Sequence, residues 1–286
     1  MELCILGVTG LLGQALAKEA SARNIRYIGV ARSNADVCLD ITSNKDLEDF
    51  VRGHHFDVII NTCAIVNHSL CDNNPEAAYC TNARPNALLA NLSKELGFKL
   101  VFISTDGYFC GDKDSKHDEV SEVKLLNEYA RTKFAGECFA LTDPNSMVVR
   151  TNIIGFKGSK QPTFLEWVIN SLKNKEKMTL FDDYYTSSIT VNQFSKALFD
   201  LLPKNPTGII NLASSEVFSK AKFITSLSET LALPLTEPNF GSVSQLASKR
   251  ADSLGLDVSR AENILEYKLP DLEAVIEQIK EEYYEI

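Results

Sequence analysis

The sequence lacks the features that mark membrane and secreted proteins. No apolar run reaches the ~18 residues that a membrane-spanning helix needs. The first residues contain no basic segment, no long apolar stretch and no small-residue cleavage site, so we expect no signal peptide. Internal repeats and low-complexity segments are also missing. We therefore expect a cytoplasmic protein without a membrane partner.

Patterns for metal or disulfide sites are missing too. The seven cysteines are an odd number and form no Cys-x-x-Cys pair, and a chain of 286 residues does not need disulfide staples. Two of only four histidines, His54 and His55, fall in a polar stretch that is typical of a loop before a strand. These patterns predict reduced thiols and no metal site.

An excess of positive charge is absent as well. The chain has 29 lysines and arginines against 38 aspartates and glutamates, which gives a formal net charge of -9. Because the charges are spread along the chain, we expect no general attraction to nucleic acid phosphates. Any anionic ligand must therefore be bound by a few local groups.

What the sequence does contain is an alternation of short apolar runs with helical patterns. The runs at 3–6, 26–30, 58–60 and 100–103 indicate strands that are buried on both faces. The alternation predicts an α/β fold with a Rossmann-type, doubly wound parallel sheet. Further predicted elements are helices from about 11, at 75–97, 125–141, 164–172, after 190, 220–231 and 272–284, and strands at 147–150 and 208–212.

A glycine-rich loop, residues 7–13, follows the first predicted strand and opens the first predicted helix. Glycine permits a tight turn and lets the backbone approach a pyrophosphate, whose charge meets exposed amides and the positive end of the helix dipole. The spacing is G-x-x-G-x-x-G, and glycines also serve ordinary turns, but the position favours cofactor binding. The residues predicted to bind the cofactor here are Gly7, Thr9, Gly10, Leu11, Leu12 and Gly13.

The second predicted strand ends without the acid that holds the ribose 2′-hydroxyl of NAD. Arg32 and Ser33 stand at that place. A guanidinium can bind a 2′-phosphate through two hydrogen bonds, so this pair favours NADP(H) and leaves NAD(H) open. The alternative is that Arg32 is a solvated loop residue. Asp40 and Ile41, further along, are predicted to border the adenine.

Tyr129 and Lys133 lie four residues apart in a helical pattern, so both side chains project from one face. A phenol with a reference pKa of ~10 exchanges protons poorly at neutral pH, but a neighbouring ammonium lowers that pKa. Tyr129 would protonate a carbonyl oxygen during hydride transfer, and Lys133 would also bind the nicotinamide ribose. Such pairs also occur by chance on amphipathic surfaces, but their place after a nucleotide loop favours catalysis.

The fourth long apolar run ends at Ser104-Thr105-Asp106. This is the carboxyl edge of the predicted sheet, where open parallel sheets bind their ligands. A hydroxyl group there can orient a substrate carbonyl. We therefore predict Thr105, Tyr129 and Lys133 as the catalytic residues.

Together these residues resemble the extended short-chain dehydrogenase/reductases, and within them the dTDP-4-dehydrorhamnose reductase group. Residues 104–111 are similar to that group's Ser-Thr-Asp-Tyr-Val-Phe-Asp-Gly, and 127–137 to its Asn-x-Tyr-Gly-x-x-Lys-x-x-Gly-Glu. The resemblance implies an NAD(P)H-dependent oxidoreductase of carbohydrate biosynthesis that reduces the 4-keto group of a nucleotide-linked 6-deoxysugar. It also implies cofactor contacts from Cys63, Ala64 and Asn82.

Several positions depart from that group's pattern. Gly107 replaces a tyrosine, Cys110 replaces an aspartate, and Lys249-Arg250-Ala251 stands where Arg-Pro is usual, which suggests a related reductase with a substrate of its own. Gly107 also occupies the place of the glutamate of related dehydratases, so dehydration is disfavoured. The residues predicted to bind the nucleotide-sugar substrate, or alternatively to be solvated surface residues, are Asp106, Tyr108, Thr163, Thr186, Ser187 and Arg250.

Two other functions stay open on the sequence. It also resembles the regulatory β subunit of methionine adenosyltransferase, which carries the same glycine loop and Tyr-x-x-x-Lys pair and would bind NADP without reducing a sugar. A nucleotide-sugar epimerase would use the same tyrosine with a tightly held NAD, although Arg32 argues against it. Consumption of NADPH with a sugar nucleotide separates the reductase from both.

The order of elements predicts two interleaved parts. Residues 1–155 are expected to form the NAD(P)-binding Rossmann domain and 156–286 mainly the substrate-binding part. Because 208–212 has the pattern of another buried strand, the segment of about 185–215 is expected to return to the Rossmann domain. A homodimer through helices near 125–141 is left open, since charges such as Lys124 and Glu128 equally suit a solvated face.

Overall fold

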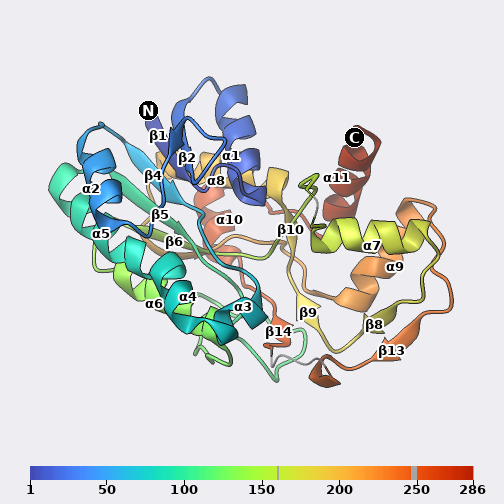
Figure 1. Cartoon of the computed structure of the whole chain (residues 1–286). Helices are drawn as coiled ribbons and strands as arrows, with labels where there is room; N and C mark the ends of the chain where they lie inside the picture. The colour runs from blue at the N-terminus through green and yellow to red at the C-terminus, as the bar shows by residue number, and fades with distance from the viewer. Residues whose placement is uncertain (160, 246–249, 286) are drawn as a thin grey trace. The chain divides into compact units, whose positions relative to one another are not determined.

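The computed structural model describes residues 1–159, 161–245 and 250–285 of the chain (Figure 1). The chain divides into two compact units, each built from three segments. Unit 1 comprises Met1–Thr105, Leu125–Arg150 and Leu198–Ile210, and unit 2 comprises Asp106–Lys124, Thr151–Ala197 and Asn211–Ile286. The chain therefore passes several times from one unit to the other instead of through a single linker.

A seven-stranded sheet with the order β11-β6-β5-β4-β1-β2-β3 forms the centre of unit 1. Its strands are β1 (Glu2–Leu6), β2 (Arg26–Ala31), β3 (Val37–Cys38), β4 (Val58–Asn61), β5 (Lys99–Ile103), β6 (Met147–Arg150) and β11 (Gly208–Asn211). β1 pairs in parallel with β2 and β4, and β5 pairs in parallel with β4 and β6. The predicted doubly wound parallel sheet is confirmed, and its order reverses between β1 and β4.

The helices of unit 1 include one correction to the sequence analysis. They are α1 (Leu11–Ala22), α2 (Asn44–Arg52), α3 (His68–Asn73), α4 (Pro75–Asn82), α5 (Arg84–Leu96) and α6 (Glu128–Ala140). The single helix predicted at 75–97 is wrong, because α4 and α5 are separated at Ala83. Pro85 has no N–H for a carbonyl one turn earlier, which interrupts the helix. At this break, Asn86 Nδ2 donates to the carbonyls of Asn82 and Ala83 at 3.2 and 3.3 Å.

The apolar strands of unit 1 are buried as their sequence predicts. Ile59, Leu100 and Phe102 belong to one buried cluster, and α5 packs against α2, α6 and β5. Gly136 allows α6 to approach the sheet closely. A Cβ atom there would lie 2.7 Å from the Asn82 carbonyl oxygen and 2.8 Å from the Phe102 ring, so no larger residue fits without a shift.

Unit 2 combines helices with small sheets around its own apolar core. Its elements are β7 (Ile153–Ile154), α7 (Phe164–Lys173), β8 (Thr179–Phe181), β9 (Tyr185–Thr186), β10 (Ile189–Thr190), α8 (Val191–Leu201, continuing into unit 1), β12 (Phe218–Ser219), α9 (Lys220–Thr230), β13 (Asn239–Gly241), β14 (Ser253–Leu254), α10 (Ser259–Leu265) and α11 (Leu272–Glu285). β9 lies between β12 and β14. The core joins α7, α9 and α11 through residues such as Ile169, Phe223 and Ile276.

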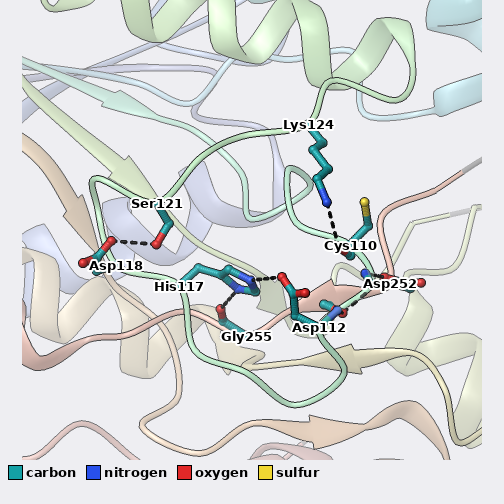
Figure 2. Close-up of polar contacts among 10 residues, drawn as sticks. Cys110, Asp112, His117, Asp118, Ser121, Lys124, Asp252 and Gly255 are labelled. Carbon is teal, nitrogen blue, oxygen red and sulfur yellow. Dashed lines mark hydrogen bonds and ion pairs between the residues drawn. The ribbon is translucent and has the colours of Figure 1, made fainter.

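The segment Asp106–Lys124 of unit 2 is fixed to the strand region around Gly255 (Figure 2). The His117 ring stacks on Phe109 with centroids 4.1 Å apart, and its Nδ1 lies 2.9 Å from the Gly255 carbonyl oxygen. The backbone N–H of His117 donates to that same oxygen. Gly111 donates its N–H to Asp252 at 2.8 Å. These contacts hold the segment that begins with Asp106 against the rest of unit 2.

All seven cysteines are free in the structure, and reduced thiols stay a prediction. Burial raises the pKa of Cys63 to about 12, so this thiol is protonated at neutral pH. Within residues 1–159, 161–245 and 250–285, no three acidic, histidine or cysteine side chains gather as a metal site requires. No helix in these same ranges combines the length and apolar character of a membrane span.

Candidate active site

The glycine loop of unit 1 forms a tight turn between β1 and α1. Gly7 has a φ of 88°, which favours glycine, and the Gly10 N–H donates to the Gly7 carbonyl at 2.9 Å. A Cβ atom on Gly13 would lie 2.2 Å from the Gly7 carbonyl oxygen. Two of the three glycines are therefore required by the fold of the loop itself.

The start of α1 fits a bound anion. Most helices of unit 1 begin with a side-chain cap, as α2 does with Ser43 and α6 with Asn127. The N-cap of α1 is Gly10, which makes no side-chain cap hydrogen bond. The first amides of α1 thus face no capping side chain, and together with the helix dipole they suit a pyrophosphate. Leu11 and Leu12 form the first turn, with Leu12 buried and Thr9 exposed.

Arg32 and Ser33 are exposed directly after β2, as a contact with a 2′-phosphate requires. The Asp40 carboxylate accepts hydrogen bonds from the Thr42 N–H at 2.9 Å and the Thr42 hydroxyl at 2.8 Å. These bonds hold the pKa of Asp40 below its ordinary value, with a smaller contribution from Arg32. Ile41 is buried in the core of unit 1, whereas Asp40 is exposed. Of the two residues predicted to border the adenine, Asp40 is therefore the accessible one.

The loop after β4 is held in place by Asn82. The Asn82 amide accepts from the Ile65 N–H at 2.7 Å and donates to the Ile65 carbonyl at 3.1 Å. It also donates to the Thr132 hydroxyl of α6 at 3.0 Å. Asn82 thereby connects the Cys63–Ala64 segment to the helix that carries Tyr129 and Lys133. A positioning role explains these contacts, and a direct contact of Asn82 with a cofactor stays a prediction.

Cys63 interacts electrostatically with residues from both ends of the predicted cofactor site. Burial is the main cause of its raised pKa, but Lys133 and Arg32 lower that pKa and Asp40 raises it. The Cys63 thiol also lies beside the glycine loop, 3.0 Å from where a Cβ of Gly7 would be. Gly7, which follows β1, and Cys63, which comes after β4, therefore lie side by side at the carboxyl edge of the sheet.

Lys133 is buried, and its ammonium group is well defined by its contacts. Nζ donates to the Ile103 carbonyl at 2.7 Å and lies 4.1 Å from the centroid of the Phe102 ring. Burial lowers the pKa of Lys133 to about 7, against the opposing effect of Glu137. A nearby negative charge would favour its protonated form, which is the behaviour required of a lysine that supports a phenolate.

Tyr129 lies one turn before Lys133 on α6. Its ring stacks on His68 with centroids 5.0 Å apart and an interplanar angle of 20°. Asn127, the N-cap of α6, contacts His68 Nδ1 at 3.3 Å and accepts from the Ala130 N–H at 2.9 Å. The first turn of α6 therefore fixes the direction of the Tyr129 ring.

Thr105 lies two residues after the end of β5 and is buried. Its neighbour Ser104 donates to Glu137 Oε1 at 2.6 Å, and Glu137 pairs with Arg150 of β6 at 2.8 Å. Glu137 and Arg150 are both at least 98% buried. This network ties the ends of β5 and β6 to α6 one turn after Lys133. The motif 127–137 contained Glu137, but its spacing did not show that it bonds Ser104.

Asp106 is the best placed of the substrate residues predicted in unit 2. It is buried and accepts from Asn152 Nδ2 at 2.7 Å. Ser188 donates to Asn152 Oδ1 at 2.8 Å and contacts the Thr186 hydroxyl at 2.9 Å. Thr186 therefore supports Asp106 through two other side chains. A direct substrate contact of Thr186 stays a prediction.

The other predicted substrate residues are less accessible or have structural partners. Tyr108 is fully buried. Ser187 Oγ accepts from the Leu256 N–H at 3.1 Å. Thr163 is the N-cap of α7 and also donates to the Gly155 carbonyl at 2.8 Å. Arg250 is exposed and forms a hydrogen bond with Tyr184. Lys249 lies outside the described residues.

A cluster that the sequence analysis missed surrounds Asp106 in unit 2. Tyr184 and Lys220 both interact electrostatically with Asp106, and Arg250 forms a hydrogen bond with Tyr184. Burial raises the pKa of Tyr184 to about 12 and lowers that of Lys220 to about 8. These residues are far apart in the sequence and belong to no motif. Only the fold brings them together.

Comparison with known proteins gives a match over nearly the whole chain. The family model described as RmlD substrate binding domain matches residues 1–285. A Haloferax volcanii protein named "Probable low-salt glycan biosynthesis reductase Agl14" is 24% identical over 96% of this chain and 95% of its own. The dTDP-4-dehydrorhamnose reductase of Salmonella typhimurium is 29% identical over 65% of this chain, and the match spans 61% of that enzyme.

Solved structures agree with this match. A hypothetical dTDP-4-dehydrorhamnose reductase from Sulfolobus tokodaii is 31% identical, with a TM-score of 0.85 over 96% of this chain and 99% of its own. The Bacillus anthracis dTDP-4-dehydrorhamnose reductase, solved in complex with NADP, has a TM-score of 0.88 over 98% of both chains. At 23% identity, this second likeness concerns the fold alone.

Proposed function

We propose, from the fact that this chain belongs to the RmlD substrate binding domain family, that it reduces the 4-keto group of a nucleotide-linked 6-deoxysugar with NADPH. The observation that carries the proposal is the arrangement around α6. Tyr129 and Lys133 lie one turn apart beside the end of β5, where Thr105 stands, and residues of the glycine loop lie at the same edge of the sheet. The names of the similar proteins support a sugar-nucleotide reductase.

The residues of unit 1 fit a dinucleotide. The start of α1 would hold the pyrophosphate, Arg32 and Ser33 the 2′-phosphate of NADP(H), and Asp40 would lie near the adenine. Arg32 favours NADP(H) over NAD(H), and the NADP in the Bacillus anthracis relative agrees with that choice. Cys63 and Ala64 would border the nicotinamide half. When bound, NADPH supplies the hydride that reduces the carbonyl carbon.

The catalytic residues then handle the proton and orient the carbonyl. Thr105 donates a hydrogen bond to the carbonyl oxygen, and Tyr129 transfers its phenolic proton to that oxygen as the new hydroxyl forms. The phenolate that remains on Tyr129 is stabilised by the Lys133 ammonium. Because the pKa of Lys133 is about 7, this negative charge shifts the lysine towards its protonated form at the moment it is needed.

We assign substrate binding to unit 2 and cofactor binding to unit 1. This division keeps the predicted Rossmann domain over most of 1–155 but gives Asp106–Lys124 to the substrate side. Asp106 and Arg250 are the unit 2 residues whose charges suit a sugar and a diphosphate. We propose that the reaction takes place in the cytoplasm. A homodimer stays a prediction.

The test is NADPH oxidation, followed by its absorbance, with a panel of nucleotide-linked 4-keto-6-deoxysugars including dTDP-4-dehydrorhamnose. We expect turnover by the wild type and a fall of about 10²- to 10⁴-fold in kcat for Tyr129→Phe, the usual size of a general-acid contribution. Tyr267→Phe, at an exposed position of unit 2, is the control and should leave kcat unchanged.

Other outcomes separate the alternative functions. An epimerase would interconvert sugars without consuming added NADPH. A regulatory subunit would bind NADPH and consume none with any sugar of the panel, and it would co-purify with a methionine adenosyltransferase. Either result would reject the reductase.

A further inference from the structure

Lys220 is an unusual lysine within unit 2. It is the first residue of α9 and is only partly exposed. Its Nζ lies 4.4 Å from the centroid of the Phe164 ring and 5.9 Å from that of Tyr184. Among the residues that the structure describes, the Lys220 ammonium has these ring contacts but no hydrogen bond and no ion pair. A lysine ammonium has three N–H donors, so all three can donate to a ligand.

The fold holds Lys220 firmly in this place. Its backbone N–H donates to the Tyr184 carbonyl at 2.9 Å, and the preceding strand β12 pairs with β9 through Phe218 and Thr186. Ser219 caps α9 by accepting from the Lys222 N–H at 3.1 Å. The aromatic rings and the backbone thus define the position of the ammonium group, although no acceptor in the described chain receives its protons.

Asp106 supplies the complementary charge. Its carboxylate is buried, is held by Asn152, and raises the pKa of Lys220 against the larger lowering by burial. The two groups therefore attract each other. A hydroxyl group both donates and accepts hydrogen bonds, so it can donate to Asp106 and accept from Lys220. A phosphate would be repelled by the carboxylate.

We infer that Lys220 is a substrate-binding, specificity-determining residue, which together with Asp106 binds a hydroxyl group of the sugar against the Phe164 ring. The inference rests on the proposed function and specifies which chemical group unit 2 recognises. Asp106 directly follows Thr105 in the chain, which is consistent with recognition of the sugar instead of the distant nucleoside. Arg250, which is exposed and bonds Tyr184, stays the residue for the diphosphate.

The experiment compares the binding of dTDP-rhamnose and dTDP to the full chain saturated with NADP, by calorimetry. Lys220→Met keeps the length and apolar stem of the side chain but removes the donors. We expect it to weaken dTDP-rhamnose binding about tenfold or more, the factor for one lost charged hydrogen bond, and to change dTDP binding less than about threefold. Lys220→Arg, which keeps the charge, should recover part of the loss.

Lys222→Met is the matched control on the same helix. Lys222 is exposed and pairs with Glu216 at 2.7 Å, so its loss should change neither affinity. Asp106→Asn should weaken dTDP-rhamnose binding and leave dTDP binding close to the wild-type value. Equal weakening of both ligands by Lys220→Met would assign Lys220 to the diphosphate and overturn the inference. Unchanged affinity for both would overturn it as well.

Stability distinguishes binding from a structural role. Because Lys220 is desolvated without an acceptor, Lys220→Met should keep or raise the melting temperature of the free protein. A lower melting temperature would indicate a structural lysine and contradict the inference.

NADPH turnover separates this inference from the proposed function. A wild type that binds dTDP-rhamnose more tightly than dTDP but oxidises no NADPH would reject the proposed reductase and leave the role of Lys220 supported. A wild type with no preference for dTDP-rhamnose would overturn the inference even if it were an active reductase.

Discussion

The two units place functional side chains in different ways. In unit 1, the glycine loop spans seven consecutive residues, and Tyr129 and Lys133 are one turn apart on a single helix. In unit 2, the residues around Asp106 come from separate segments that contain Asn152, Tyr184, Lys220 and Arg250. Local geometry dictates the first arrangement, because strand ends and helix turns fix it. Packing of distant segments dictates the second, and it therefore leaves no motif.

The largest expected effect concerns the buried network of Ser104, Glu137 and Arg150 in unit 1. Glu137→Gln leaves the Arg150 charge buried beside a neutral partner and should lower the free energy of unfolding by about 3–5 kcal/mol. Chemical denaturation of the wild type and the variant measures this. Glu277→Gln, which removes an exposed pair with Lys280, is the control and should cost no more than about 1 kcal/mol. Equal losses would show that the Glu137 network does not stabilise unit 1.

A second change separates the ligands of the two units. Gly13→Ala places a methyl group against the Gly7 carbonyl, where a Cβ would be 2.2 Å away, so the glycine loop must shift. We expect NADPH binding to weaken by about a hundredfold or more, in proportion to the loss of a few kcal/mol of phosphate contacts. Binding of dTDP should stay within a few-fold of the wild type. Gly97→Ala, in open space at the end of α5, should not change NADPH affinity, although its φ of 82° costs some stability.

The pH dependence of stability tests the lowered pKa of Lys133. Its pKa is lowered from 10.5 to about 7 in the folded protein, so the unfolded chain binds one more proton between these values. The stability of the cofactor-free protein should therefore rise with pH from about 7 to 10 because of this group. Lys220, with a pKa of about 8, contributes in the same direction. Lys133→Met should reduce this rise, as thermal unfolding across that pH range would reveal; an unchanged slope would contradict the lowered pKa.

The smallest expected effect concerns Thr163. Its side chain caps α7 and bonds the Gly155 carbonyl, so Thr163→Ala should cost about 1 kcal/mol of stability, as the loss of an N-cap does. Thr163→Ser keeps the hydroxyl and should restore most of it. If the variant instead keeps its stability and loses affinity for dTDP-rhamnose, Thr163 is a substrate residue, as the sequence analysis predicted.

The one prediction that the structure contradicts has a clear physical cause. The helix predicted at 75–97 breaks because Pro85 lacks an N–H, which outweighs the continuous helical pattern around it. Thr163 was predicted to bind the substrate; its hydroxyl caps α7, and a substrate contact stays a prediction. The sequence did not predict a role for Lys220, because a lysine at the start of a helical pattern is common. Its lack of an acceptor is visible only when Phe164 and Asp106 are placed around it.

The sequence by itself determined the doubly wound sheet, the loop at Gly7–Gly13 and the pairing of Tyr129 with Lys133, because each depends on residues that are neighbours along a strand, a turn or a helix. Tertiary structure alone decided that Glu137 joins Ser104 to Arg150 and that Lys220 lies near Asp106. The residues of these interactions lie up to 114 positions apart in the sequence, as 220 minus 106 gives. No local pattern encodes such distances, since burial and charge act between side chains only after the chain has packed.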